Sequence, residues 1–220
     1  MKHLGVQAPK RASKVTCLFL DIGGVLLTNG WDHHARKRAA AQFKLEHAAM
    51  EARHQMNFGV LEEGKLTLDD YLDRVIFTKK RPFTQAQFRR FMFAQSKPYP
   101  KMLALAARMK RQYGLKIAVV SNESRELNAH RIAAFDLTGF VDFFVSSCYV
   151  HIRKPDMDIF RLALDIAQTP VEQIVYIENT PLFVDLAEGL GIRSILHTDY
   201  ASTVRKLASF GLRDSEGDCP

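Results

Sequence analysis

Four polar groups follow short apolar runs of the kind that form buried strands. They are Asp21, the pair Ser121-Asn122, Lys154 and the pair Glu178-Asn179. Because the carboxyl ends of parallel strands meet at one edge of an open sheet, these groups are expected to converge in one crevice. A carboxylate there can act as a nucleophile if a nearby cation offsets the charge of an anionic substrate. The pattern therefore predicts covalent attack on an anionic ester.

The segment around Asp21 is the most informative part of the sequence. Asp21 ends the apolar run Val15–Leu20 and precedes Ile22-Gly23-Gly24-Val25. Glycines at such a turn allow a ligand to approach the backbone closely. Two residues after Asp21, where a second acid would complete a catalytic pair, the residue is Gly23.

The elements that must position these groups alternate along the chain. Helical patterns separate most of five runs rich in Val, Ile and Phe, and one of these helices, 100–113, ends at Gly114. This alternation predicts an α/β fold with a doubly wound, Rossmann-like parallel sheet. The expected strands are 15–20, 116–121, 141–146, 173–178 and 193–197.

The interval between the first two strands breaks the alternation. It contains helical patterns only, at 31–54, 67–77 and 84–94, whereas one crossover helix is usual. We therefore expect an all-α subdomain inserted directly after Asp21. The predicted organisation is a flexible basic lead 1–14, a core of 15–30 and 99–212, a helical cap 31–98 and a flexible tail 213–220.

These motifs, in this order and with this insertion, resemble the haloacid dehalogenase superfamily, especially its phosphatase-like members with a helical cap. The resemblance covers roughly residues 15–200. It implies that Asp21 is the nucleophile of a magnesium-dependent phosphatase acting on a small phosphate ester. It also implies that the phosphoryl group is held by Ser121, Asn122 and Lys154, with Gly24 as a further substrate contact. The implied Mg²⁺ ligands are Asp21, the carbonyl of Gly23, Glu178 and Asn179.

Two positions depart from the pattern of the superfamily. Its phosphatases usually carry a second Asp where this chain has Gly23, and an Asp is common where it has Asn179. General acid–base assistance is typically worth about 10²–10⁴-fold in rate, so slow turnover or a replacement acid is expected. The candidate replacements are His33, His34 and His151, although surface or loop roles are the simpler interpretation for each.

Two other functions stay open. The absence of an acid at positions 23 and 179 is compatible with a non-catalytic protein that binds a phosphate ligand or a protein partner. A metal-free 2-haloacid dehalogenase would use Asp21 to attack carbon and would also lack the second acid. Glu178-Asn179 fits the dehalogenase less well than it fits the phosphatase.

Composition narrows the class of protein further. The formal net charge is +7, and residues 31–98 carry thirteen basic against eight acidic residues, a bias that would attract anions. No nucleic-acid recognition motif accompanies this charge, so no nucleic-acid partner is expected. No apolar stretch is long enough for a membrane span, so no membrane partner is expected either. Three cysteines without metal or disulfide spacing favour the reducing cytoplasm. The oligomeric state and the substrate cannot be inferred from the sequence.

Overall fold

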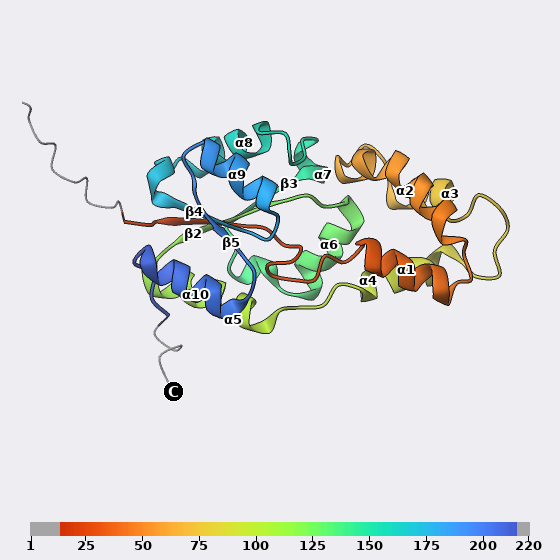
Figure 1. The fold of residues 1–220 in the computed structure, drawn as a ribbon, viewed down its shortest axis with the longest axis horizontal. Coiled ribbons are helices and arrows are strands. Elements are labelled where there is room, and N and C mark those ends of the chain that lie inside the picture. Colours follow the sequence, from red (N-terminus) through yellow and green to blue (C-terminus); the bar gives the residue numbers. More distant parts are fainter. Residues whose placement is uncertain (1–13, 215–220) are drawn as a thin grey trace, which may run out of the picture.

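The computed structural model describes residues 14–214 and contains one five-stranded parallel sheet (Figure 1). The strand order is β3-β2-β1-β4-β5, with β1 in the centre. Leu18 of β1 pairs with Ile117 of β2 on one side and with Val175 of β4 on the other. The α/β doubly wound fold predicted from the sequence is confirmed.

The strands lie close to the predicted ranges. They are β1 (Cys17–Leu20), β2 (Lys116–Ser121), β3 (Phe143–Ser146), β4 (Ile174–Glu178) and β5 (Arg193–Leu196). The helices that accompany them are α5 (Pro100–Tyr113), α6 (Arg125–Ala134), α7 (Ser147–Val150), α8 (Asp158–Ala167), α9 (Pro181–Gly189) and α10 (Tyr200–Ser209), with short 3₁₀ turns η1 (Leu137–Gly139) and η2 (Val171–Gln173). Within residues 14–214 no helix is long and apolar enough to cross a bilayer.

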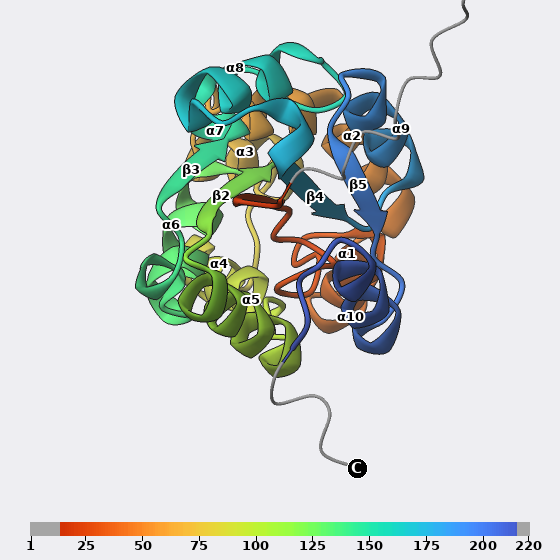
Figure 2. The same cartoon turned by 90° about the vertical axis from the view of Figure 1, so that its left-hand side faces the viewer.

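Helices cover both faces of the sheet (Figure 2). Side chains alternate between the faces along each strand. In β1, Leu18 and Leu20 pack with α5 and α10, whereas Cys17 and Phe19 pack with α8 and α9. Both faces of the central strands are therefore buried, which explains why these strands appear in the sequence as unbroken apolar runs.

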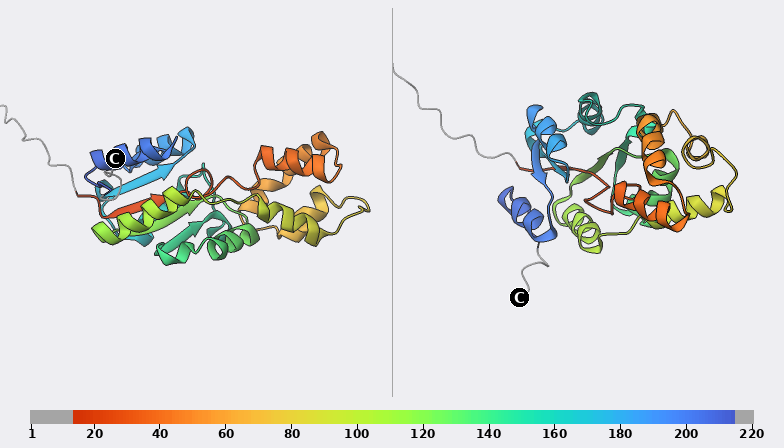
Figure 3. Two further views of the ribbon diagram at one scale, coloured as in Figure 1. Left: turned by 90° about the horizontal axis from the view of Figure 1, so that it is seen from below. Right: turned by 45° about the vertical axis from the view of Figure 1, so that its right-hand side comes forward.

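Four helices lie between β1 and α5 and form what we call the helical insert. They are α1 (His33–Gln42), α2 (His47–Glu62), α3 (Leu68–Val75) and α4 (Gln85–Ala94). The insert has its own apolar core, which includes Tyr71, Leu72, Phe88 and Met92. It lies beyond the carboxyl ends of the strands, next to the sheet edge where Asp21 is placed (Figure 3).

The helical pattern predicted over 31–54 corresponds to two helices, α1 and the first half of α2. The chain breaks at residues 43–46, where Lys44 takes a left-handed backbone conformation (φ 51°). Glu46 then begins α2, because its carboxylate accepts hydrogen bonds from the backbone N–H groups of Ala48 (2.8 Å) and Ala49 (2.6 Å). A carboxylate at this position satisfies helix N–H groups that would otherwise lack partners.

The predicted flexible tail also needs correction at its first residues. Asp214 is buried, and its carboxylate pairs with the guanidinium of Arg108 on α5 (Nε–Oδ1 3.0 Å, Nη2–Oδ2 2.6 Å). The backbone carbonyl of Arg213 accepts a hydrogen bond from the hydroxyl of Tyr113 (2.9 Å). Residues 213–214 are thus part of the fold. Residues 215–220 and all of the predicted lead except Lys14 lie outside the described part of the chain.

A buried arginine ties the two connections of the insert to the sheet. Arg131 on α6 donates to the carbonyl of Thr28 (3.2 Å) in the first connection and to the hydroxyl of Ser96 (3.0 Å) in the second. Its guanidinium also pairs with the buried carboxylate of Glu123, two residues after β2. One side chain therefore holds both connections against the loop that follows Ser121.

We predict that Arg131→Met destabilises the protein by about 3–5 kcal/mol, because Glu123 would be left as a buried charge without its partner. The matched control is Arg161→Met, which removes an exposed ion pair with Asp158 and should cost less than about 1 kcal/mol. Urea unfolding of both variants measures the difference. If both variants lower the free energy of unfolding equally, Arg131 does not hold the two connections of the insert as described.

Candidate active site

A buried lysine forms the centre of the site at the carboxyl edge of the sheet. The ammonium group of Lys154 contacts the carboxylates of Asp21 (Nζ–Oδ1 2.8 Å) and Glu178 (Nζ–Oε2 2.6 Å). It also donates to the hydroxyl of Tyr176 (2.9 Å) and lies 3.3 Å from the carbonyl of Val120. Lys154 is 1% exposed. The predicted site residues Asp21, Lys154 and Glu178 are therefore in direct contact.

Burial and the charge of the oppositely charged partner shift the pKa values of Asp21 and Lys154 in opposite directions. Burial raises the pKa of Asp21 to about 7, the ammonium of Lys154 opposes that rise, and the Glu178 carboxylate adds to it. For Lys154, burial alone would lower the pKa, but the charges of Asp21 and Glu178 raise it above its usual range. The lysine therefore stays charged and holds the two carboxylates next to each other.

The two residues that end β2 have different surroundings. Ser121 is buried, and its hydroxyl hydrogen-bonds the Asp21 carboxyl, which lowers the pKa of that group. The amide of Asn122 instead pairs with the backbone of Lys154, donating to its carbonyl (2.8 Å) and accepting from its N–H (2.8 Å). Asn122 thus fixes the loop that carries Lys154, a contact that the sequence does not predict.

The glycines after Asp21 serve a tight turn. Gly24 has a positive φ (80°), and its N–H donates to the carbonyl of Leu27 (2.6 Å), so that N–H is occupied within the protein. A Cβ on Gly24 would lie 2.2 Å from the Asn179 amide. A Cβ on Gly23 would lie 3.1 Å from Oδ1 of Asn29 and 3.9 Å from Oδ2 of Asp21. Asn29 therefore borders the space that a second acid would take.

The amide of Asn179 lies between two of the other three predicted metal ligands, Gly23 and Glu178. Its end atom is 3.0 Å from the carbonyl oxygen of Gly23 and 2.9 Å from Oε1 of Glu178. With nitrogen at that position, the amide donates to both oxygens. With oxygen there, the amide oxygen would lie 3.0 Å from the Gly23 carbonyl oxygen and 2.9 Å from Oε1 of Glu178. Both distances match the spacing of adjacent ligands around an octahedral ion with metal–oxygen distances near 2.0–2.1 Å. The donor set thus fits Mg²⁺ when the amide presents its oxygen.

Glu178 has limited capacity for a metal. Its Oε2 accepts from Lys154 and Tyr176, and its Oε1 accepts from the backbone N–H groups of Asn179 (3.0 Å) and Thr180 (2.9 Å). A metal at Oε1 would compete with these N–H groups or bind through water. Asp21 Oδ2 is the carboxylate oxygen that Lys154 does not contact.

A cavity of about 420 Å³ opens between this cluster and the helical insert. The insert and its connections contribute Trp31, Arg36, His54, Phe58 and Glu62 to the lining. An ion pair closes one side, because Arg153 donates to the Glu62 carboxylate from Nε (3.0 Å) and from Nη2 (2.8 Å). The cavity therefore has charged and aromatic walls and can enclose a small molecule.

The histidines proposed as replacement acids are not at the centre of the site. His33 lines the cavity from the start of α1, whereas His34 and His151 are not among its lining residues. His151 instead contacts the carbonyl of Glu63 through Nδ1 (2.6 Å). Trp31 also lines the cavity, and its indole N–H donates to the hydroxyl of Tyr71 (2.9 Å) in the core of the insert.

Sequence reasoning missed several residues of this site. Tyr176 is two residues before Glu178 in β4, and that spacing alone places both side chains on one face of the strand. Glu123 directly follows the Ser121-Asn122 pair, but its partner Arg131 lies on a helix that the sequence analysis did not identify. No sequence signal pairs Glu62 with Arg153, since they are 91 residues apart.

Comparison with known proteins places the chain among hydrolases. A family model for haloacid dehalogenase-like hydrolases matches residues 15–182. Bifunctional epoxide hydrolase 2 from Rattus norvegicus is 28% identical over 126 residues, covering 54% of this chain and 22% of that protein. The putative pyrophosphatase PpaX from Caldanaerobacter subterraneus is 30% identical over 89 residues, covering 40% of each. The chain thus matches less than half the length of these two relatives.

Solved structures show the same fold. A haloacid dehalogenase family enzyme from Bacteroides thetaiotaomicron, in complex with magnesium and inorganic phosphate, has a TM-score of 0.68 at 17% identity, with 86% of this chain and 98% of that chain covered. The L-2-haloacid dehalogenase from Xanthobacter autotrophicus has a TM-score of 0.59 at 16% identity, with coverage of 94% and 92%. At these identities the likeness establishes the fold alone.

His54 provides a test of the buried wall of the cavity. Burial and, second, the charge of Arg36 lower its pKa to about 4, so the histidine is neutral in the folded protein at pH 7. The unfolded chain binds this proton near pH 6.5, so the stability contributed by His54 is lost as the pH falls from about 6.5 to 4. We predict a loss on the order of 2 kcal/mol across this range.

The measurement is urea unfolding at pH 7.5 and pH 4.5 for the wild type and for His54→Asn. Between these two pH values, the free energy of unfolding should fall less in His54→Asn than in the wild type, by that amount. His34 is exposed, so His34→Gln should behave like the wild type. An identical pH dependence in all three proteins would show that His54 is not held neutral.

Proposed function

Because the chain belongs to the haloacid dehalogenase-like hydrolases, we propose that it is a magnesium-dependent phosphatase acting on a small phosphorylated compound. The observation that carries this proposal is the contact between the Asp21 carboxylate and the buried ammonium of Lys154 in the cavity below the helical insert. A nucleophilic carboxylate beside a fixed cation is suited to attack on an anionic phosphoryl group.

The proposed reaction has two steps. An oxygen of Asp21 forms a bond to phosphorus while the bond from phosphorus to the ester oxygen breaks, and the leaving group departs as its oxyanion and takes a proton from solvent. Water then attacks the phosphorus of the aspartyl phosphate, the bond to Asp21 breaks, and inorganic phosphate and the free carboxylate are released. Lys154 offsets the charge of both anions, and the hydroxyl of Ser121 can donate to a phosphoryl oxygen. Asn122 supports these steps by fixing the Lys154 loop.

Mg²⁺ would be held by Asp21, the Gly23 carbonyl, Glu178 and Asn179, where it supplies positive charge next to the phosphoryl oxygens. The converging oxygens of Gly23, Glu178 and the Asn179 amide support this assignment. The relatives support it as well, since one is named a putative pyrophosphatase and one neighbour was solved with magnesium and phosphate.

The leaving alcohol needs a proton, and Gly23 cannot give one. The acids that line the cavity have other partners: Glu62 pairs with Arg153, Glu123 pairs with Arg131, and Asp32 caps α1. The proposed enzyme therefore acts best on esters whose leaving group departs without a proton, such as aryl or acyl phosphates.

A second candidate function is phosphate or partner binding without turnover. The observation that favours it is Asn29, whose amide oxygen borders the space above Gly23 where an acid would act. Such a protein would bind an anion through Lys154 and Ser121 but leave the ester intact.

We predict that Asp21→Asn lowers the rate of phosphate release from p-nitrophenyl phosphate at least about 10³-fold, because an amide cannot form the covalent intermediate. Asp185→Asn, an exposed change on α9 of the core, is the matched control and should leave the rate unchanged. The rate is measured with and without millimolar Mg²⁺. Unchanged release in Asp21→Asn would eliminate the mechanism.

We predict that Gly23→Asp accelerates turnover of alkyl phosphates by about 10²–10⁴-fold, because it supplies the missing proton donor next to Asp21. Gly23→Asn is the control, since it has nearly the same shape without the acid. Asn29 must move by a few tenths of an ångström to admit either side chain. A wild type that is inert on aryl phosphates, with turnover appearing only in Gly23→Asp, would favour the binding function.

A further inference from the structure

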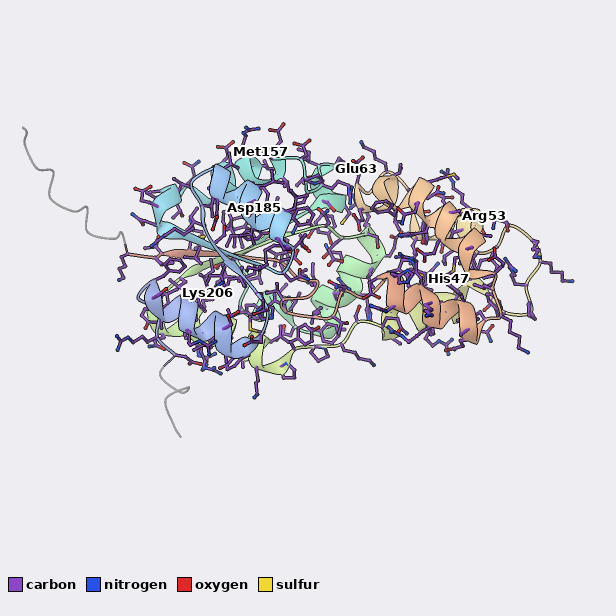
Figure 4. The ribbon with its side chains drawn as sticks, viewed as in Figure 1. His47, Arg53, Glu63, Met157, Asp185 and Lys206 are labelled. Carbon is purple, nitrogen blue, oxygen red and sulfur yellow. The ribbon has the colours of Figure 1, made fainter. Side chains whose placement is uncertain are left out.

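Two histidines and a glutamate meet on the helical insert, away from the Asp21–Lys154–Glu178 cluster. His33 is the first residue of α1, His47 is the first residue of α2, and Glu51 follows His47 by one helical turn. The two imidazole rings are 5.4 Å apart between centroids. Figure 4 labels His47 on the insert, at the opposite end of the molecule from Lys206.

The ligand atoms of the three residues are spaced for a metal ion rather than for hydrogen bonds. Nδ1 of His33 is 3.8 Å from Oε2 of Glu51, and Nε2 of His47 is 3.6 Å from Oε1. All three ligand atoms lie within 4.8 Å of one another. A tetrahedral zinc ion with bonds of 2.0–2.2 Å separates its ligand atoms by about 3.4 Å. The two histidine–glutamate distances exceed this spacing by only a few tenths of an ångström, although they go to different oxygens of Glu51. Since the ligand atoms lie up to 4.8 Å apart, side-chain rotations that bring them closer by up to about 1.4 Å would complete the coordination.

His47 supplies an independent indication of a ligand. Its Nε2 atom is buried from solvent and has no hydrogen-bond partner among residues 14–214. Buried polar atoms almost always have a partner, so an atom without one needs an explanation. The explanation here is that Nε2 points at Glu51 across a gap that suits a cation.

Arg36 holds the glutamate in a fixed orientation. Its guanidinium donates to Oε1 (2.6 Å) and Oε2 (2.9 Å) of Glu51, and it also donates to the carbonyl of Trp31 (2.7 Å). Each carboxylate oxygen keeps a second lone pair for another partner. In metal sites, a neighbouring group often fixes the orientation of a ligand in this way. The positive charge of Arg36 will lower the affinity of the site for a cation.

We propose that His33, His47 and Glu51 bind a divalent transition-metal ion of the Zn²⁺ type. Two imidazole nitrogens and one carboxylate are ligands that Zn²⁺ accepts, whereas Mg²⁺ prefers oxygen ligands. Three protein ligands leave a fourth position for water or another group. Because His33 and Arg36 also line the cavity above Asp21, the ion would lie at its rim, and it would join α1 to α2. This site is independent of the proposed phosphatase activity.

The test is a calorimetric titration of Zn²⁺ into the metal-free full-length protein in the presence of excess Mg²⁺. A Cys219→Ser background removes the thiol that lies outside the described residues. We expect one zinc ion per chain with Kd at or below about 10 µM, and at least tenfold weaker binding in His33→Gln and in His47→Gln. His34→Gln changes a neighbouring histidine outside the cluster and should bind like the wild type.

A second readout separates loss of the site from loss of the fold. Zinc should raise the Tm of the wild type, because binding to the folded state alone stabilises it, and should leave the Tm of His33→Gln and His47→Gln unchanged. In EDTA all of these proteins should unfold at similar temperatures. Zinc binding that is equally tight in the double variant His33→Gln/His47→Gln, or no binding by the wild type at 100 µM, about ten times the expected Kd, would overturn the proposal.

Discussion

The buried ammonium of Lys154 is the interaction on which the site depends. Two carboxylates, Asp21 and Glu178, reach the same small volume from neighbouring strands, and their mutual repulsion in a buried place would be costly without a cation. Lys154 meets both, and the amide of Asn122 fixes the backbone that carries it. The charge that holds these two carboxylates together is also suited to offset a phosphoryl group in the proposed reaction.

The helical insert is held to this site at its two connections to the core and at the end of α2. Arg131 contacts both connecting segments, while Glu62 pairs with Arg153 next to the Lys154 loop. These contacts hold the insert over the cavity. They also occupy the acids that could have replaced the one missing at Gly23. The structure thus places a carboxylate beside a buried cation, as the proposed attack requires, while the acids that line the cavity are paired with other groups.

The sequence is sufficient to predict the architecture, because buried parallel strands are continuous apolar runs and their tips carry the polar groups. It also locates Asp21, Lys154 and Glu178, whose side chains meet as the topology requires. It fails where contacts join distant segments: Arg131 with Thr28, Arg153 with Glu62, and Asp214 with Arg108. Nor does it locate the break within the helical pattern over 31–54, where Lys44 takes a left-handed conformation between α1 and α2. Local periodicity carries no information on either kind of feature.

The central claim is that Asp21 is phosphorylated during turnover. The most direct measurement is borohydride trapping of the enzyme during reaction with an aryl phosphate and Mg²⁺, followed by mass spectrometry of its peptides. Borohydride reduces an acyl phosphate to an alcohol, so the account predicts homoserine in place of aspartate at position 21. Phosphate release with Asp21 unmodified, or with the modification on another carboxylate, would contradict it.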